Sequence, residues 1–114
     1  MEPGDLAHRI VELASDRKAV DVVLLRTAEL TTMADYFVIC SGRSERQVQA
    51  LSRGIVDELR DAGIRPLGVE GVGAARWVLL DYGDVIVHLF APEERDYYGL
   101  ERLWSDAAEV VRVV

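Results

Sequence analysis

The side chains best suited to chemistry lie close together within residues 76–90. This run contains His88 and two carboxylates, Asp81 and Asp84. A histidine beside a carboxylate can form an acid–base pair, and paired carboxylates can hold a divalent cation. No nucleophile motif lies near His88, however, and two carboxylates on a flat face are poor ligands for such an ion. We therefore favour a contact surface over a catalytic site in this run.

A second candidate site is the stretch Ser41-Gly42-Arg43-Ser44, between a predicted strand and a predicted helix. Free N–H groups at a helix N-terminus can hold an anion, but the stretch lacks the spaced glycines and the lysine of a P-loop. The pattern is also similar to nucleotidyltransferases, which need paired acidic residues on the following strand to hold Mg²⁺. That strand contains only Glu70. We therefore expect no metal, no cofactor, no catalytic residue and no enzymatic activity.

Composition and charge indicate a single globular domain over residues 1–114. Half of the residues are hydrophobic and 29% are charged, which is ordinary for a chain with a packed core. A formal net charge of -7 favours a basic protein partner and argues against direct nucleic-acid specificity. The single cysteine, Cys40, excludes a disulfide framework. Because no run has the features of a membrane span or a signal peptide, we expect a cytoplasmic protein without membrane contact.

Hydrophobic spacing predicts one mixed sheet of about five strands with packed helices, in the α/β or α+β class. The predicted elements, in chain order, are a helix over 5–17, strands over 20–25 and 35–41, a helix over 45–61, an edge strand over 65–70, a hairpin over 76–90 and a helix from Pro92 whose apolar stripe reaches Ala107. Asp5 and Ser44 are the expected N-caps, and Gly63 is the expected stop of the middle helix. Gly54 predicts a close approach of that helix to the sheet. The last five residues fit either an added strand or a frayed tail.

The hairpin is expected to turn at Tyr82 and Gly83, because Gly83 can adopt a positive φ without steric cost. This turn sets Asp81 opposite Asp84, and the strand period of two then produces two unlike faces. One face carries Trp77, Leu79, Asp81, Asp84, Ile86, His88 and Phe90. The other face carries Val78, Leu80, Val85, Val87 and Leu89, and it must be covered by helices.

The face that carries Trp77 is predicted to bind a partner. Like charges opposite each other on a sheet cost roughly 0.2–1 kcal/mol, so Asp81 and Asp84 favour a cationic partner near the turn. Aromatic anchors surrounded by charges are typical of a protein interface. The anchors are Trp77, Leu79, Ile86 and Phe90, and the polar ends are Asp81, Tyr82 and Asp84. The alternative is that both aspartates are ordinary turn residues and the aromatic side chains belong to the core.

Four blocks of the sequence are more specific than any single motif. They are Asp35-Tyr36-Phe37-Val38-Ile39-Cys40-Ser41-Gly42-x-Ser44-x-Arg46-Gln47-Val48, Glu70-Gly71, Trp77-Val78-Leu79-Leu80-Asp81-Tyr82-Gly83-Asp84-Val85-x-Val87-His88 and Tyr98-x-Leu100-Glu101-x-Leu103-Trp104. In order and spacing these blocks resemble the ribosomal silencing factor family, also called the RsfS or Iojap family. The resemblance extends over residues 6–107.

The resemblance implies a nucleotidyltransferase-like fold without a catalytic site. It implies binding to the large ribosomal subunit through ribosomal protein L-fourteen, which would block joining of the small subunit and repress translation under nutrient limitation. It also implies homodimers off the ribosome in some members. The contact residues that it implies are Trp77, Leu79, Asp81, Tyr82, Asp84, His88, Tyr98 and Glu101.

Two other functions stay open at this point. One is a nucleotide-binding enzyme of nucleotidyltransferase type that uses Ser41, Gly42 and Glu70. The other is a dimeric adaptor protein whose hairpin face is the contact between two copies. Nucleotide binding without ribosome binding would favour the first, and a monomeric Trp77→Ala variant that still binds ribosomes would favour the second.

Overall fold

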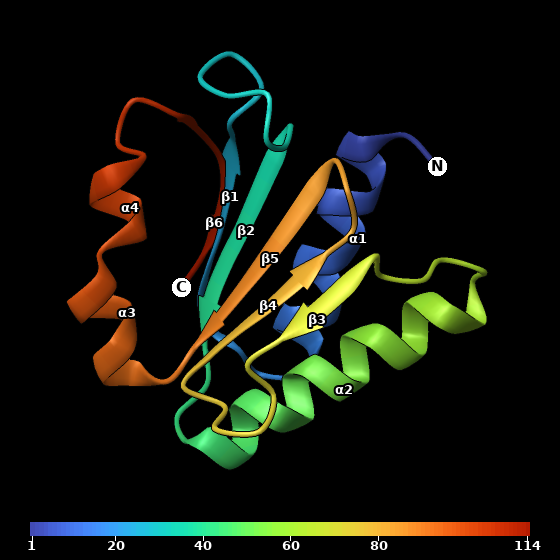
Figure 1. The fold of residues 1–114 in the computed structure, drawn as a ribbon, viewed down its shortest axis with the longest axis vertical. Helices are drawn as coiled ribbons and strands as arrows, with labels where there is room; N and C mark the ends of the chain where they lie inside the picture. The colour runs from blue at the N-terminus through green and yellow to red at the C-terminus, as the bar shows by residue number, and fades with distance from the viewer.

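Six strands form one mixed sheet in the computed structural model, which describes residues 1–114 (Figure 1). The strands are β1 (Val20–Arg26), β2 (Tyr36–Ser41), β3 (Gly68–Glu70), β4 (Trp77–Asp81), β5 (Val85–Phe90) and β6 (Ala108–Val113). Their spatial order is β3-β4-β5-β2-β1-β6, with β2 and β5 parallel and every other neighbouring pair antiparallel. The predicted mixed sheet is confirmed, with one more strand than expected because the C-terminal residues pair with β1.

Helices lie on both sides of this sheet (Figure 1). They are α1 (Pro3–Asp16), α2 (Glu45–Asp61), α3 (Pro92–Tyr98) and α4 (Leu100–Leu103). The first two pack on one face of the sheet, and the last two lie on the other. The bounds of α2 are as predicted, because the Ser44 hydroxyl accepts a hydrogen bond from Gln47 N and Gly63 follows the helix with a φ of +83°. None of the helices is long and apolar enough to cross a membrane.

Three predictions about the helices are wrong. α1 begins before Asp5, which therefore lies in the first turn instead of capping it. The helix predicted to reach Ala107 is interrupted at Gly99, whose left-handed φ of +56° separates α3 from α4. Gly54 does not mark an approach to the sheet, because a Cβ there would meet the Arg17 side chain from the end of α1.

The two faces of the β4–β5 hairpin are covered to different degrees. On the side of α1 and α2 the hairpin side chains are all buried, namely Val78, Leu80, Val85, Val87 and Leu89. The predicted helix-covered face is therefore confirmed. On the opposite side the inward residues of β5 are buried, whereas Trp77 and Leu79 of β4 stay partly exposed.

The predicted register of the hairpin is wrong by two residues. The observed cross-strand pairs are Trp77–Phe90, Leu79–His88 and Asp81–Ile86. The two loop residues are Gly83 and Asp84, since Tyr82 N donates to Val85 O at 2.9 Å and Gly83 has a φ of +85°. Because the shift is even, the strand residues keep their predicted faces. Asp81 and Asp84 are not opposite each other, however, so no cross-strand repulsion arises between them.

Val85→Asp places a carboxylate in the core beneath α1 and α2, where Val85 is fully buried. We expect it to lower the free energy of unfolding by about 4 kcal/mol or more, measured by urea denaturation followed by circular dichroism. Val69→Asp, on the exposed edge strand β3, is the matched control and should cost less than about 1 kcal/mol. A Val85→Asp variant as stable as this control would mean that the two faces are assigned in reverse.

Candidate docking surface

Trp77 is the centre of an aromatic group on the partly open face of the sheet. Its ring centroid lies 4.6 Å from that of Tyr98 and 5.1 Å from that of Phe90. Tyr98 is the last residue of α3, so this group joins the hairpin to the helical segment that follows it. Such aromatic pairs contribute roughly 0.5–1.5 kcal/mol each beyond their buried area. The structure thus brings together two predicted contact residues, Trp77 and Tyr98.

His88 is buried beside Trp77. The indole Nε1–H of Trp77 donates to His88 Nδ1 at 3.1 Å, and the Phe37 ring packs edge-on at 5.0 Å. Because an indole nitrogen is only a donor, Nδ1 is unprotonated and the neutral imidazole carries its proton on Nε2. Burial lowers the pKa of His88 to about 4. His88 therefore orients Trp77 as a neutral ring instead of pairing with an aspartate, and its direct contact with a partner stays a prediction.

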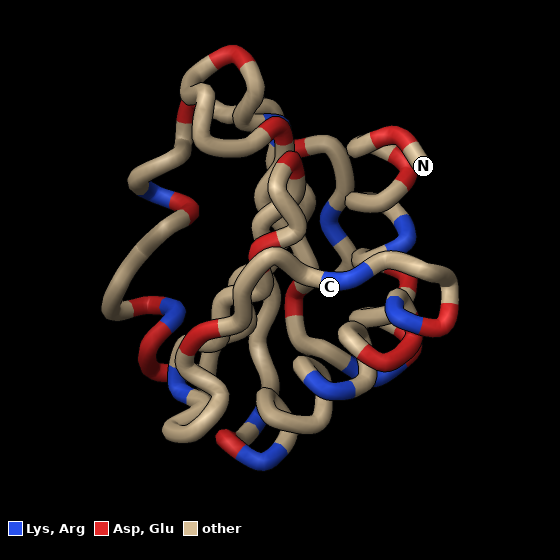
Figure 2. The backbone as a smooth tube through the Cα atoms, turned by 45° about the vertical axis from the view of Figure 1, so that its right-hand side comes forward, with Lys and Arg blue, Asp and Glu red and all other residues tan.

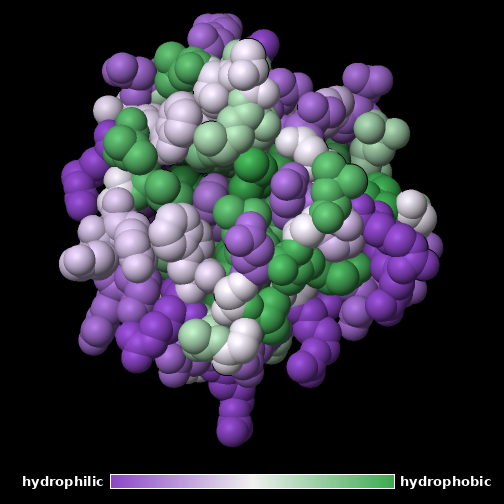
Figure 3. Space-filling view, viewed as in Figure 1, coloured by the Kyte–Doolittle hydropathy of each residue, from purple (hydrophilic) through white to green (hydrophobic).

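A shallow hollow of about 330 Å³ lies beside the aromatic group and is lined by Glu70, Gly71, Trp77 and Leu79. Gly71 has a φ of +83°, and a side chain there would collide with the backbone carbonyl of Trp77. Figure 3 shows apolar side chains over the middle of this side of the molecule, with hydrophilic side chains around them. An apolar centre with a polar rim is the usual composition of a protein interface.

Carboxylates gather at the end of the sheet where the β4–β5 turn meets the β1–β2 connection. Asp35 N donates to Asp84 O at 2.8 Å, which holds the two segments side by side. Figure 2 shows that acidic positions predominate at this upper end of the molecule. Asp81 accepts a hydrogen bond from Gly83 N at 2.8 Å, and Asp84 is exposed. The turn therefore presents negative charge at the end of β4, two residues beyond Leu79 of the hollow, which favours cationic groups in a partner.

Tyr82 lies on the face opposite to Trp77. Its ring packs against the core beneath α1 and α2, and its hydroxyl is buried without a hydrogen-bond partner. Burial raises the pKa of Tyr82 to about 12. The expectation that Tyr82 forms a polar end of the Trp77 face is therefore wrong.

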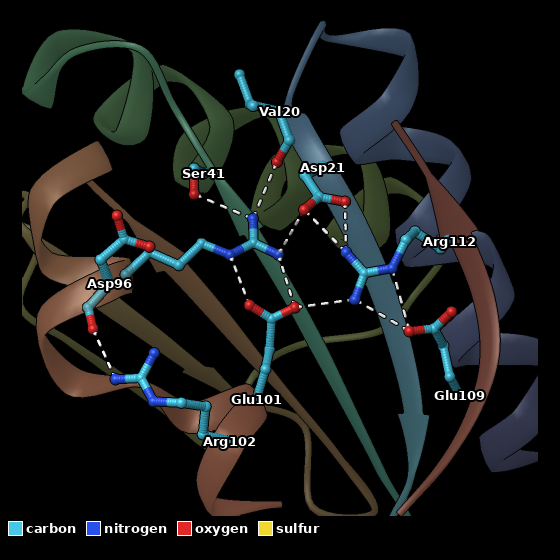
Figure 4. Close-up of polar contacts among 9 residues, drawn as sticks. Val20, Asp21, Ser41, Asp96, Glu101, Arg102, Glu109 and Arg112 are labelled. Carbon is cyan, nitrogen blue, oxygen red and sulfur yellow. Dashed lines mark hydrogen bonds and ion pairs between the residues drawn. The ribbon is translucent and has the colours of Figure 1, made fainter. Parts of the chain in front are cut away.

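Glu101 is held by two arginines that the sequence analysis did not single out (Figure 4). Its carboxylate accepts hydrogen bonds from Arg95 Nε at 3.1 Å, Arg95 Nη2 at 3.2 Å and Arg112 Nη2 at 3.2 Å. Burial favours a higher pKa for Glu101, but the two arginines outweigh it and hold the pKa below its usual value. Arg112 also binds both carboxylate oxygens of Asp21. No local pattern indicates this cluster, because Asp21 and Arg112 are 91 residues apart.

The Ser41-Gly42 turn uses its polar groups within the chain. Gly42 N and Arg43 N donate to acceptors of the same chain, and the Ser41 hydroxyl accepts a hydrogen bond from Arg95. Glu70 lines the hollow near β3 and β4, whereas Ser41 and Gly42 line a different pocket near Arg95. The structure does not bring together the residues that the nucleotide-binding hypothesis requires.

The chain forms a small mixed α+β domain whose two sheet faces differ. One face of its sheet is closed by α1 and α2, and the other leaves an aromatic surface partly open beside an acidic turn. Neither the aromatic group nor the hollow beside it contains a nucleophile paired with a base.

Comparison with known proteins identifies the family. The family model described as "Ribosomal silencing factor during starvation" (RsfS) matches residues 1–113. The chain is 49% identical over 92 residues to the ribosomal silencing factor RsfS of Bacillus subtilis, covering 81% of this chain and 78% of that protein. It is 30% identical to the mouse protein "Mitochondrial assembly of ribosomal large subunit protein 1", covering 92% of this chain and 51% of that protein. A crystal structure from Chromobacterium violaceum is 38% identical, with a TM-score of 0.89 over 92% of this chain and 88% of that one. The chain belongs to the ribosomal silencing factor family.

His88 makes the stability of the fold depend on pH. The unfolded chain protonates the imidazole near pH 6.5 and the folded chain only near pH 4, so stability falls as the pH drops between these values. At about pH 4.5 the loss attributable to His88 should be roughly 2–3 kcal/mol relative to about pH 7.

Urea unfolding at both pH values of the parent and of His88→Gln measures this loss, which the variant should lack. His8→Gln removes the exposed histidine and should behave like the parent. The same pH dependence in all three proteins would contradict a neutral, buried His88.

Proposed function

We propose that this protein binds the large ribosomal subunit through a basic ribosomal protein, ribosomal protein L-fourteen, and blocks joining of the small subunit. Translation is thereby repressed under nutrient limitation, in the cytoplasm. This role requires no catalytic group and no cofactor. A domain that measures 34 × 34 × 24 Å, bound to the joining surface, keeps the small subunit away by its volume alone.

The observation that carries the proposal is the partly open aromatic face beside an acidic turn. Trp77, Leu79 and Tyr98 offer apolar area, and Asp81 and Asp84 offer negative charge at its border. Proteins that bind RNA phosphates are rich in lysine and arginine, so a basic ribosomal protein complements this surface. The net charge of -7 makes such a protein a better partner than the RNA itself.

The names of the relatives support the ribosomal part of the proposal. The family description concerns ribosomal silencing during starvation, and the mouse relative is named for the large ribosomal subunit. Off the ribosome, the same apolar face is the surface that we expect a homodimer to cover.

A subunit-joining assay tests the proposal. Purified protein is added to separated large and small subunits under conditions that support their association, and joined ribosomes are quantified on sucrose gradients. We expect the joined fraction to fall as the protein reaches equal concentration with the large subunit. Unchanged joining at saturating protein would contradict the proposal.

Asp81→Lys should weaken binding to large subunits about tenfold or more at low salt, because it reverses a charge beside the aromatic face. Asp61→Lys makes the same charge change at the exposed end of α2, beyond the opposite face of the sheet, and should bind like the parent. Affinities are measured by cosedimentation at two salt concentrations, with circular dichroism to confirm folding. If both variants bind equally well, the acidic turn is not part of the contact.

A further inference from the structure

The side chain of Arg95 extends from α3 towards the start of β1 and the end of β2. Its side chain is only 10% exposed. It donates to both carboxylate oxygens of Glu101, to Val20 O at 3.2 Å and to the Ser41 hydroxyl at 3.1 Å. A planar fork that binds a carboxylate with two parallel bonds is geometrically specific. Arg95 therefore ties α3 to α4 and to the ends of β1 and β2.

Arg112 closes the same cluster from β6. It binds Asp21 at 2.7 and 2.8 Å, Glu101 at 3.2 Å and Glu109 at 3.0 Å. Asp21 has a φ of +45°, which is rare for a residue other than glycine, and it lies where the β1–β2 register shifts. Observed backbone strain of this kind is a reason to look for a function. Here the strained Asp21 carboxylate lies within 4 Å of both arginines.

Apart from this cluster, partly buried side chains hold the segment of α3 and α4. Leu100 and Trp104 pack on the sheet, where the Trp104 ring lies 5.2 Å from that of Phe37. Glu94 pairs with Arg76 at 2.9 Å. Neither α3 nor α4 contains a buried residue, and Gly99 joins them in a left-handed conformation. The segment nevertheless carries Tyr98, whose ring lies 4.6 Å from that of Trp77. Arg95 and Glu101 lie on either side of Tyr98 in the chain, so their ion pair and the aromatic contacts of Tyr98 and Trp104 together decide where the segment lies.

We propose that Arg95 and Glu101 are positioning residues for the docking surface. Their ion pair is a clamp that fixes α3 and α4 so that Tyr98 packs against Trp77. Glu101 therefore affects binding through the position of Tyr98 and does not touch the partner. The inference rests on the proposed function and deepens it, because it assigns the presentation of Tyr98 to residues outside the contact.

The free protein tests the clamp without any ribosome. In a Trp104→Phe background, Trp77 is the only tryptophan, so acrylamide quenching reports its exposure. Arg95→Gln/Glu101→Gln removes the pair and leaves neither member unpaired, and we expect quenching to rise about twofold as Tyr98 moves away. Arg60→Gln/Asp57→Asn removes an exposed pair on α2 and is the matched control. Quenching equal to that of the control would overturn the proposal.

Binding to large subunits distinguishes positioning from direct contact. Arg95→Gln/Glu101→Gln should weaken binding about tenfold in the parent but less than about twofold in a Tyr98→Ala background, because its effect passes through Tyr98. Equal losses in both backgrounds would overturn the proposal and make Glu101 a direct contact.

Urea unfolding confirms that each variant folds. If the double variant does not fold, Arg112→Gln weakens the same clamp from its more exposed side. Its effect on binding to large subunits is then compared in the parent and in the Tyr98→Ala background. If the parent itself binds no large subunit, the proposed function fails, and the quenching experiment still decides whether the clamp positions Tyr98.

Discussion

Side chains alternate along β4 and β5, and this alternation gives the sheet its two unlike faces. Successive residues of a strand point to opposite faces, so one hairpin supplies an aliphatic row to the core under α1 and α2 and an aromatic row to the other face. Burial of the aliphatic row, at roughly 25 cal/mol per Å² of apolar area, stabilises the fold. The aromatic row is covered only in part, because α3 and α4 are short and bury none of their own residues.

The side chains on the open part of that face have different roles. Trp77 supplies apolar area and is held by the neutral ring of His88, while the acidic turn at the end of the sheet supplies charge. Aromatic anchors contribute most to affinity, and charges at the border contribute more to the rate and selectivity of association. A surface of this kind needs rigid support, and the Arg95–Glu101 pair provides it from outside the apolar area.

Local signals explain which parts of the structure were predictable. Ser44 and Gly63 fix both ends of α2, and the aliphatic residues around Val85 identify the helix-covered face. The predicted hairpin register is wrong because Tyr82-Gly83 and Gly83-Asp84 both suit a two-residue turn. The shift between the two registers is even, so the strand residues still lie on their predicted faces. Tyr82 lies on the opposite face because it pairs with Val85 just beyond β4 instead of forming the loop. The ion pairs around Glu101 are not predictable from local sequence, because Asp21 and Arg112 are 91 residues apart and the C-terminal tail that carries Arg112 has no clear pattern.

Binding of the large subunit through the Trp77 face is tested by cosedimentation of the parent protein and Trp77→Ala with separated large and small subunits. We expect the parent to sediment with large subunits only. Trp77→Ala, although folded, should lose about tenfold or more in affinity because its main apolar anchor is gone. Undiminished binding of Trp77→Ala, or no binding of the parent to large subunits, would contradict this role of the Trp77 face.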